Sequence, residues 1–477
     1  MKSKYKVVIG LEMHCELKSN SKVFSPSKNS YCEVTNTNVN EIDLGFPGVL
    51  PTVNVQCVKN AIKMAMILNC EIPKYMVFDR KHYFYPDLPK GYQLTQFTQP
   101  VGVNGSLKIK NQDKEIVVGI HDIHLEEDAA AMEHKENSSI IDYNRAGVPL
   151  LEIVTTPCLH SAQETVMFLE CMRQIYQYCD ISDADTKKGQ VRCDVNISIC
   201  DPNDTKLGTR IEIKNVNSFS NVYDAINYEI KRQSELKDAG RYDEVKQETK
   251  RYDEQLAKTI TMRTKNDAID YRYFVDPNLP KFEITEEWKQ QIKNEIPRLH
   301  FERKQKYISE YSLSDEDANI LVKEKSISDY FEKCLKLKIS PKDACNWINV
   351  NVLGYMNKHN LKINDIFLTP EMLAFLLDKL KQQVISSKQV KEIFFKVLDE
   401  KKPPQTFITK ESSQISDEKE LEKIIVEIIK NNPVQQQQYK CGKSKVFDFF
   451  VGQVMKQTKG KANPNVTKQI LQKKLSD

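Results

Sequence analysis

The chain has 477 residues, which at about 100–200 residues per domain corresponds to roughly two to four domains, each long enough to bury a core. Its hydrophobic content of 40% and mean hydropathy of −0.54 are typical of a soluble globular protein. No apolar run reaches the roughly 18 residues that a membrane span needs. The net charge of +4 is small for this length and by itself indicates no class of partner.

The N-terminal residues favour the cytosol, and the cysteines indicate no metal or redox motif. Met1–Tyr5 lead directly into a strand-like run, without the apolar core of a secretory signal or the composition of a transit peptide. The twelve cysteines include no C-x-x-C pair, so neither a zinc ribbon nor a redox motif is indicated. Cys57, Cys70 and Cys171 lie in apolar helical patterns and are interpreted as reduced core residues. We expect a cytosolic protein, with an organelle not excluded.

The hydrophobic pattern divides the chain into three predicted domains. Residues 1–294 contain many short alternating runs, which favour a strand-rich α+β domain. Residues 295–402 are predicted to be helical, because apolar residues recur at three-to-four spacing at Ile327, Tyr330, Phe331, Cys334 and Leu335. The Lys-Lys-Pro-Pro sequence at 401–404 interrupts this pattern. Residues 403–477 are predicted to form a small helical tail.

Polar and apolar side chains alternate in several predicted strands. Glu12 and His14 are two residues apart and share one face of a strand. Two later runs alternate in the same way, and their polar positions are Arg192, Asp194, Asn196, Ser198, Arg210, Glu212 and Lys214. For any single run, a solvated face of an antiparallel sheet is the simpler explanation. Together the runs mix carboxylates, cations, an amide and a histidine, which favours a polar face that holds a metal and phosphates.

Further carboxylates lie outside these runs. The three acids Glu126–Asp128 come shortly after the sequence His-Asp-Ile-His at 121–124. Glu152 stands alone in the apolar run 148–154, and burial of an unpaired carboxylate is costly. Glu152 is therefore either neutralised in the core or functional, and the residues alone leave both explanations open.

Residues 79–87, Asp-Arg-Lys-His-Tyr-Phe-Tyr-Pro-Asp, interleave basic and aromatic side chains. Such a segment can contact phosphate and stack on a base. A surface hairpin with half-buried tyrosines is the simpler alternative.

One motif is excluded. Gly-Lys-Ser at 442–444 resembles the end of a phosphate-binding loop, but Gln437 occupies the position of that motif's first glycine, and no strand precedes it. No local arrangement of residues indicates a glutamine-hydrolysing nucleophile, although such residues can be dispersed along a chain.

The C-terminal segment is basic. Between residues 440 and 474 it has nine lysines against one acid, Asp448. Lys456, Lys459 and Lys461 cluster in a predicted loop. A solvated helical face is the usual explanation for such a run, and contact with nucleic-acid phosphates is the alternative.

A set of motifs extends over nearly the whole chain: Val8–His14, Leu44–Pro51, Asp79–Asp87, Asn144–Glu152, Arg192–Asn196, Glu212–Ser218, Asp270–Phe274, Val451–Met455 and Lys459–Pro464. In this order the motifs strongly resemble the GatB family, the B-type subunits of the aspartyl/glutamyl-tRNA amidotransferases. The ordered set is far more specific than any one of its members.

This resemblance implies a heterotrimer. An amidase subunit would release ammonia from glutamine, and a small third subunit would act as a clamp. The GatB subunit would use ATP and magnesium to phosphorylate the side-chain carboxylate of Glu-tRNA(Gln) or Asp-tRNA(Asn), after which ammonia displaces phosphate. Phosphoryl transfer needs a metal and cations around the phosphate oxygens. The family's cradle, helical domain and tail would correspond to residues 1–294, 295–402 and 403–477.

The resemblance also implies roles for individual residues. The predicted metal ligands are Glu12, His14, Glu127 and Glu152. The predicted catalytic residues are Glu127, Glu152, Asp194, Glu212 and Lys81. The predicted nucleotide contacts are Arg80, Tyr83, Arg192, Asn196, Ser198 and Lys214. The predicted tRNA contacts are Lys456, Lys459 and Lys461. Lys81 and Glu127 also mark the expected entrance of an ammonia tunnel.

The chain departs from the family pattern in three places. Relatives usually continue with Gly-Lys where Ala130 and Ala131 stand, and they usually carry acids where residues 187–188 are lysines. Some relatives have a zinc-binding cysteine set near the N-terminus, whereas this region has only Cys15 and Cys32, so no zinc is expected.

The identity of the metal is open. Magnesium prefers oxygen ligands, and histidine is an unusual ligand for it. Manganese in the site, or a water molecule between His14 and magnesium, are the alternatives.

A non-catalytic RNA-binding adaptor with structural acids is the competing interpretation. An adaptor would need the basic tail but not the combined acids and histidine, so the set favours a catalytic role. The residues do not indicate which mischarged tRNA is the substrate, and no membrane partner is expected.

Overall fold

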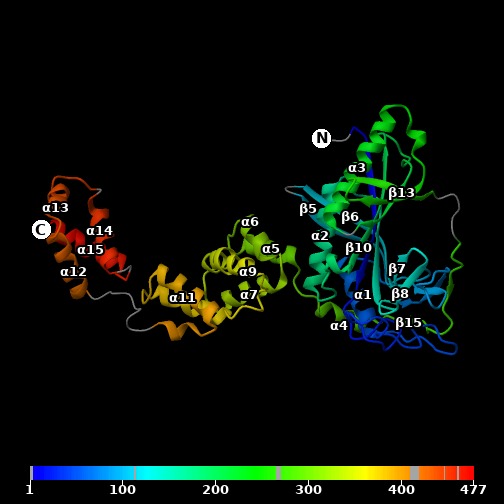
Figure 1. Cartoon of the computed structure of the whole chain (residues 1–477), viewed down its shortest axis with the longest axis horizontal. Helices are drawn as coiled ribbons and strands as arrows, with labels where there is room; N and C mark the ends of the chain where they lie inside the picture. The colour runs from blue at the N-terminus through cyan, green and yellow to red at the C-terminus, as the bar shows by residue number, and fades with distance from the viewer. Residues whose placement is uncertain are drawn as a thin grey trace. The chain divides into compact units, whose positions relative to one another are not determined.

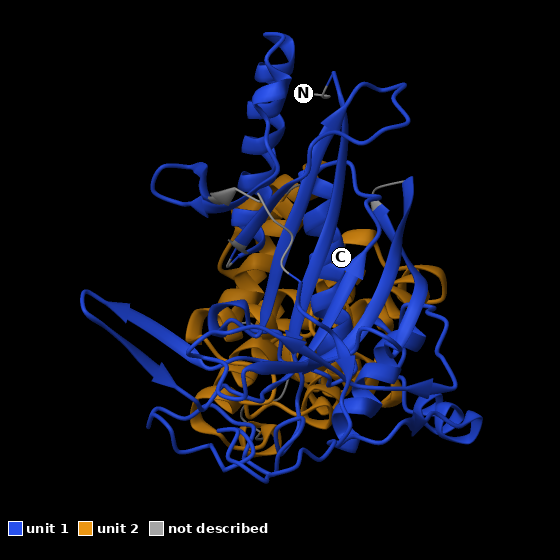
Figure 2. Cartoon of the chain, turned by 90° about the vertical axis from the view of Figure 1, so that its right-hand side faces the viewer, with its two compact units in different colours: residues 1–300 blue, residues 301–477 orange. Residues whose placement is uncertain are grey.

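The computed structural model describes residues 4–111, 114–216, 218–264, 270–408, 418–444, 446–458 and 461–476. The chain divides into two compact units, residues 1–300 and 301–477 (Figures 1 and 2). The described residues form one hydrophobic core in the first unit and two in the second. Within these ranges, no helix combines the length and apolar character needed to cross a membrane. The domain boundaries predicted after residues 294 and 402 stay predictions.

The first unit is built on a large mixed sheet (Figure 1). In the described part of the chain this sheet has eight strands, in the order β13-β12-β11-β10-β1-β9-β6-β5. The strands are β1 Lys6–Glu16, β5 Gly102–Asn111, β6 Lys114–Glu127, β9 Pro149–Thr155, β10 Val191–Cys200, β11 Ile211–Val216, β12 Glu248–Asp253 and β13 Lys258–Thr264. Strands β11 and β12 are parallel, and the other neighbours are antiparallel.

Helices α1 (Val55–Ile67), α2 (Ala162–Tyr178) and α3 (Phe219–Asp238) pack against the apolar positions of this sheet. Ser161 and Ser218 begin α2 and α3 as N-caps, because each side chain accepts a hydrogen bond from a backbone amide three residues later. Since side chains alternate along a strand, the polar positions of the same strands lie on the opposite face.

Smaller elements complete the first unit. They are β2 (Tyr75–Met76) with β15 (Phe282–Glu283), β7 (Ala131–Lys135) with β8 (Ser138–Asp142), the sheet β14 (Phe274–Val275), β3 (Asp79–His82) and β4 (Tyr92–Thr95), and helix α4 (Glu286–Asn294). Strand β4 contacts β6, so this small sheet carries the basic and aromatic segment beside the polar face of the large sheet.

The second unit is helical where it is described. Its first core is formed by α5 His300–Ser309, α6 Asp315–Leu321, α7 Lys325–Lys336, α8 Pro341–Asn346, a π-helical segment Trp347–Val352, α9 Leu353–His359, α10 Pro370–Lys381 and α11 Ser387–Glu400. Its second core is formed by α12 Glu418–Lys430, α13 Pro433–Lys440, α14 Val446–Gln457 and α15 Pro464–Ser476. The predicted α+β class, with a helical C-terminal region, is confirmed.

The core beneath the polar face can be tested at Leu11, which is 1% exposed on β1. Leu11→Ala should lower the free energy of unfolding by about 2–5 kcal/mol, because a strand held on both sides cannot close the cavity. Urea unfolding followed by circular dichroism measures the change. Val117→Ala, at a 52% exposed position of β6, is the control and should change stability by less than about 0.5 kcal/mol. Equal stability of the two variants would contradict this placement of the core.

Candidate active site

Polar side chains form a row across four adjacent strands of the large sheet. Arg192 on β10 pairs with His14 on β1, His14 pairs with Glu152 on β9, and Glu152 pairs with His124 on β6. Glu12 and Asp194 are opposite each other, two residues before His14 on β1 and two residues after Arg192 on β10. Directly opposed residues in a sheet are close enough to interact, so the register brings these groups together.

The first group contains His14, Glu126 and Glu152. The Nε2 atom of His14 lies 3.3 Å from Oε2 of Glu152 and 3.7 Å from Oε1 of Glu126. One ligand atom from each residue lies within 4.8 Å of the others. Burial and the charge of Glu152 raise the pKa of Glu126. Burial opposes the charge on His14, but the hydrogen bond and charge of Glu152 outweigh it and raise the pKa of His14.

The second group contains Glu12, Asp194 and Glu212. The amine of Lys214 lies 2.6 Å from Oδ2 of Asp194 and 3.3 Å from Oε1 of Glu212. Asn196 donates to Oε1 of Glu12 at 2.9 Å. Burial and the charge of Glu152 raise the pKa of Glu12. A β-bulge between β10 and β11 at this point brings Lys214 next to Asp194.

Glu127 points away from the first group. Its carboxylate accepts hydrogen bonds from the amine of Lys90 and from the backbone amide of Leu94. Its neighbour Glu126 occupies the position beside His14 and Glu152. Consecutive residues of a strand face opposite sides, so the two acids cannot share one environment. The prediction that Glu127 is a metal ligand stays a prediction.

The basic and aromatic segment supplies positive charge beside the first group. Burial of Lys81 on β3 lowers the pKa of its amine, but the negative charges of Glu126 and Glu152 outweigh this effect, and the pKa is raised. Among the residues that the structure describes, no carboxylate lies within 4.0 Å of the Lys81 amine. The amine lies 4.9 Å from the centre of the Tyr271 ring. Tyr83 stands edge-on to the same ring, at 6.1 Å between ring centres.

Other predicted phosphate contacts already have partners. Arg80 is paired with Asp276, and its guanidinium lies over the Tyr92 ring. Arg192 donates to Oδ2 of Asp128 at 2.8 Å. Ser198 is 5% exposed at the far end of β10. Binding a phosphate would therefore require Arg80 and Arg192 to share or exchange their present partners.

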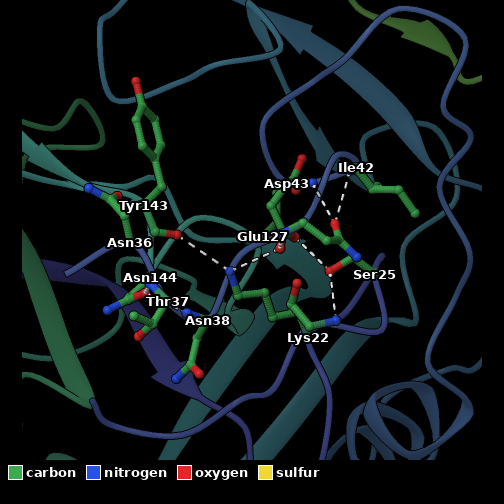
Figure 3. A network of polar contacts seen from close by, with 12 residues as sticks. Lys22, Ser25, Asn36, Thr37, Asn38, Ile42, Asp43, Glu127, Tyr143 and Asn144 are labelled. Atoms are coloured by element: carbon green, nitrogen blue, oxygen red, sulfur yellow. Dashed lines mark hydrogen bonds and ion pairs between the residues drawn. The ribbon is translucent and has the colours of Figure 1, made fainter. Parts of the chain in front are cut away.

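A buried network of polar contacts joins Lys22, Ser25 and Asp43 to the backbone of Tyr143, close to Glu127 (Figure 3). Lys22 is fully buried, and its amine lies 3.2 Å from Oδ2 of Asp43 and 3.4 Å from the carbonyl oxygen of Tyr143. Ser25 donates to Oδ1 of Asp43 at 2.6 Å. Burial lowers the pKa of Lys22, against the opposing effect of Asp43. Figure 3 shows the Glu127 side chain beside this network.

Sequence reasoning gave no role to several residues that the structure brings to the site. These residues are Glu16, Lys90, His124 and Glu126. Glu16 continues the alternation of Glu12 and His14, and burial together with the charge of Asp128 raises its pKa to about 7. Strand alternation from His124 to Glu126 was a usable signal, whereas the pairing of Lys90 was not readable from local pattern.

The predicted tRNA contacts lie in the second unit. Lys456 is exposed in the last turn of α14. Lys461 is half-buried before α15. Lys459 lies outside the described residues. Among the departures from the family pattern, Ala130 is buried next to the β7–β8 pair, and residues 187–188 are exposed.

The comparisons with known proteins agree with this architecture. Residues 7–290 match a family model described as the GatB/GatE catalytic domain, and residues 329–475 match one described as the GatB domain. These two matches place the chain in the GatB/GatE class of proteins.

Similar proteins cover the whole chain. A protein of Oceanobacillus iheyensis is 44% identical over 476 residues, covering 99% of both chains. One of Coxiella burnetii is 45% identical over 474 residues, covering 98% of this chain and 99% of the relative. Both are named as the B-type subunit of an aspartyl/glutamyl-tRNA(Asn/Gln) amidotransferase. The chain belongs to the GatB family.

How closely the buried network packs can be tested by substituting alanine for each of two glycines. Gly147 and Gly48 both have left-handed backbones, at φ +82° and +87°, so alanine costs about 1–2 kcal/mol at either position. At Gly147 the new Cβ would also lie 2.9 Å from Oδ1 of Asp43 and 3.3 Å from Cδ of Lys22. At Gly48 no described atom lies within 4 Å.

Gly147→Ala should therefore destabilise the protein by about 1–3 kcal/mol more than Gly48→Ala, since a close-packed site resists an added methyl group. Urea unfolding of the two variants measures the difference. If both variants lose the same stability, the network accommodates the new methyl group at position 147 with no further loss of stability.

Proposed function

We propose that this chain activates the side-chain carboxylate of a mischarged tRNA, as the GatB component of an aspartyl/glutamyl-tRNA amidotransferase. The observation that carries the proposal is the convergence of two acid groups, beside Lys81 and Lys214, on one face of the sheet. The names of relatives that are 44–45% identical along their whole length support the same function.

The proposed reaction has two steps. The side-chain carboxylate of Glu-tRNA(Gln) or Asp-tRNA(Asn) attacks the γ-phosphorus of ATP, which gives an acyl phosphate and ADP. Ammonia then attacks the acyl carbon and displaces phosphate, which leaves the amide. An amidase subunit would supply the ammonia from glutamine, and a small clamp subunit would complete the heterotrimer. The first step is needed because a free carboxylate has no adequate leaving group.

The two acid groups fit a divalent cation. One imidazole nitrogen and two carboxylates suit Mn²⁺, and the all-oxygen set of Glu12, Asp194 and Glu212 suits Mg²⁺. When bound, the cation would offset negative charge on the phosphate oxygens. Lys81 would approach the same oxygens from β3. Glu127, held by Lys90, is the proposed mark of the entrance for ammonia.

The remaining assignments are part of the proposal. Nucleotide contacts are assigned to Arg80, Tyr83, Arg192, Asn196, Ser198 and Lys214. The cradle, helical and tail domains are assigned to residues 1–294, 295–402 and 403–477. Lys456, Lys459 and Lys461 are assigned to the tRNA backbone. A cytosolic location stays a prediction.

The first acid group is tested by Glu126→Gln, and the predicted catalytic role of Glu127 by Glu127→Gln, both in the assembled complex. Each variant should lower tRNA-dependent ATP hydrolysis and amide formation by about 100-fold or more, because the lost charge acts mainly in the transition state. Affinity for tRNA should change little. Glu133→Gln, on the exposed β7 strand, is the control and should keep full activity.

Near-normal amidation by Glu126→Gln would remove the first group from the mechanism. Near-normal amidation by Glu127→Gln would leave that residue a structural partner of Lys90. Absence of tRNA-dependent ATP hydrolysis in the wild-type complex would favour the non-catalytic adaptor.

The tail is tested by deleting residues from Pro403 onward. Lysines that meet phosphates release counterions, so the slope of log affinity against log salt should flatten by up to about 0.9 for each phosphate that the deletion leaves unbound. Filter binding of tRNA at several salt concentrations measures this slope. Glutaminase activity of the partner without tRNA is the control and should survive. Unchanged affinity and slope would assign the lysines to a solvated face.

A further inference from the structure

His124 contacts the first group without belonging to it. It lies on β6, opposite Glu152 on β9. Its Nε2 atom lies 3.0 Å from Oε2 of Glu152, and its Nδ1 atom lies 2.8 Å from Oδ1 of Asp122. The side chain is 14% exposed, so little water competes for these contacts. The ring is therefore held from both ends by carboxylates.

Asp122 is itself held from outside. Its Oδ2 atom lies 2.6 Å from Nδ1 of His121, whose side chain is 71% exposed. A continuous series of contacts runs from the surface through Asp122 and His124 to Glu152, and then to Nε2 of His14 at 3.3 Å. Rotation of the His124 ring would break both of its carboxylate contacts, so the series fixes the ring plane.

We infer that His124 is a positioning residue that orients the Glu152 carboxylate toward a divalent cation held by His14, Glu126 and Glu152. This inference rests on the proposed function of that group. A carboxylate has several lone pairs, and a donor fixed on one of them determines where the others point. Groups that orient a metal ligand in this way commonly change metal affinity by about 10–100-fold when they are removed.

A purely structural role is the alternative. His124 also joins β6 to β9, and its removal could loosen the sheet without any specific effect on a cation. The two roles differ in what a substitute must keep. Positioning needs a donor at the place of Nε2, whereas packing needs only the volume of the ring.

The experiment compares two variants of His124 in the assembled complex. His124→Gln keeps an amide donor near the position of Nε2, and His124→Leu keeps similar volume without a donor. Mn²⁺ binding is titrated by electron paramagnetic resonance, and His14→Ala defines the part of the signal that belongs to this group. Thermal unfolding is recorded for every variant. His121→Gln, which alters only the exposed contact to Asp122, is the matched control.

We expect His124→Leu to weaken Mn²⁺ binding by about 10–100-fold and His124→Gln to recover most of the loss. His121→Gln should bind Mn²⁺ as the wild type does. At saturating Mn²⁺, ATP hydrolysis by His124→Leu should partly recover, because the loss lies mainly in affinity.

Two results would overturn the inference while leaving the proposed function intact. One is unchanged Mn²⁺ affinity in His124→Leu. The other is an equal loss in the Leu and Gln variants that follows an equal loss of thermal stability, which assigns a packing role. If the wild type has no Mn²⁺ signal that His14→Ala removes, the metal site of the proposed function fails, and the inference fails with it.

Discussion

The register of β1 is the constraint on which the rest of the first unit depends. This strand is hydrogen-bonded to β10 on one side and to β9 on the other. A slip of one residue would turn Glu12 and His14 into the core and expose Leu11 and Met13 on the polar face. Burial of the apolar face of the sheet against α1–α3 therefore fixes the register, and the register fixes the positions of the acids on the opposite face.

The polar face concentrates negative charge and neutralises it unevenly. Lys214 lies between Asp194 and Glu212, and the charge and hydrogen bond of His124 hold the pKa of Glu152 well below its usual range despite burial. The carboxylate of Glu126 is held less tightly, since the hydrogen bond that it accepts from Thr95 is 3.4 Å long. An added cation would relieve the repulsion between Glu126 and Glu152 at this point.

Local pattern predicted the class of fold and which residues share a face, because strand alternation and helical spacing are properties of neighbouring residues. Glu12, His14, Asp194 and Asn196 do lie on one face of adjacent strands. The choice between Glu126 and Glu127 depends on how β6 meets β9, including an irregularity between residues 120 and 122. The pairing of Arg80 with Asp276 joins residues 196 positions apart, and no local pattern contains it.

The buried amine of Lys22 has a consequence for synthesis of the chain. Its partner Asp43 leaves the ribosome soon after it, but the Tyr143 carbonyl that also accepts from Lys22 follows 121 residues later. The backbone amides of Asn36 and Thr37 likewise have their acceptors in Asp142 and Asn144. The N-terminal segment therefore stays hydrated and open while more than a hundred residues are added. Strand β1 waits longer still, because its neighbours β9 and β10 begin only at residues 149 and 191, and such pairing between distant residues forms slowly.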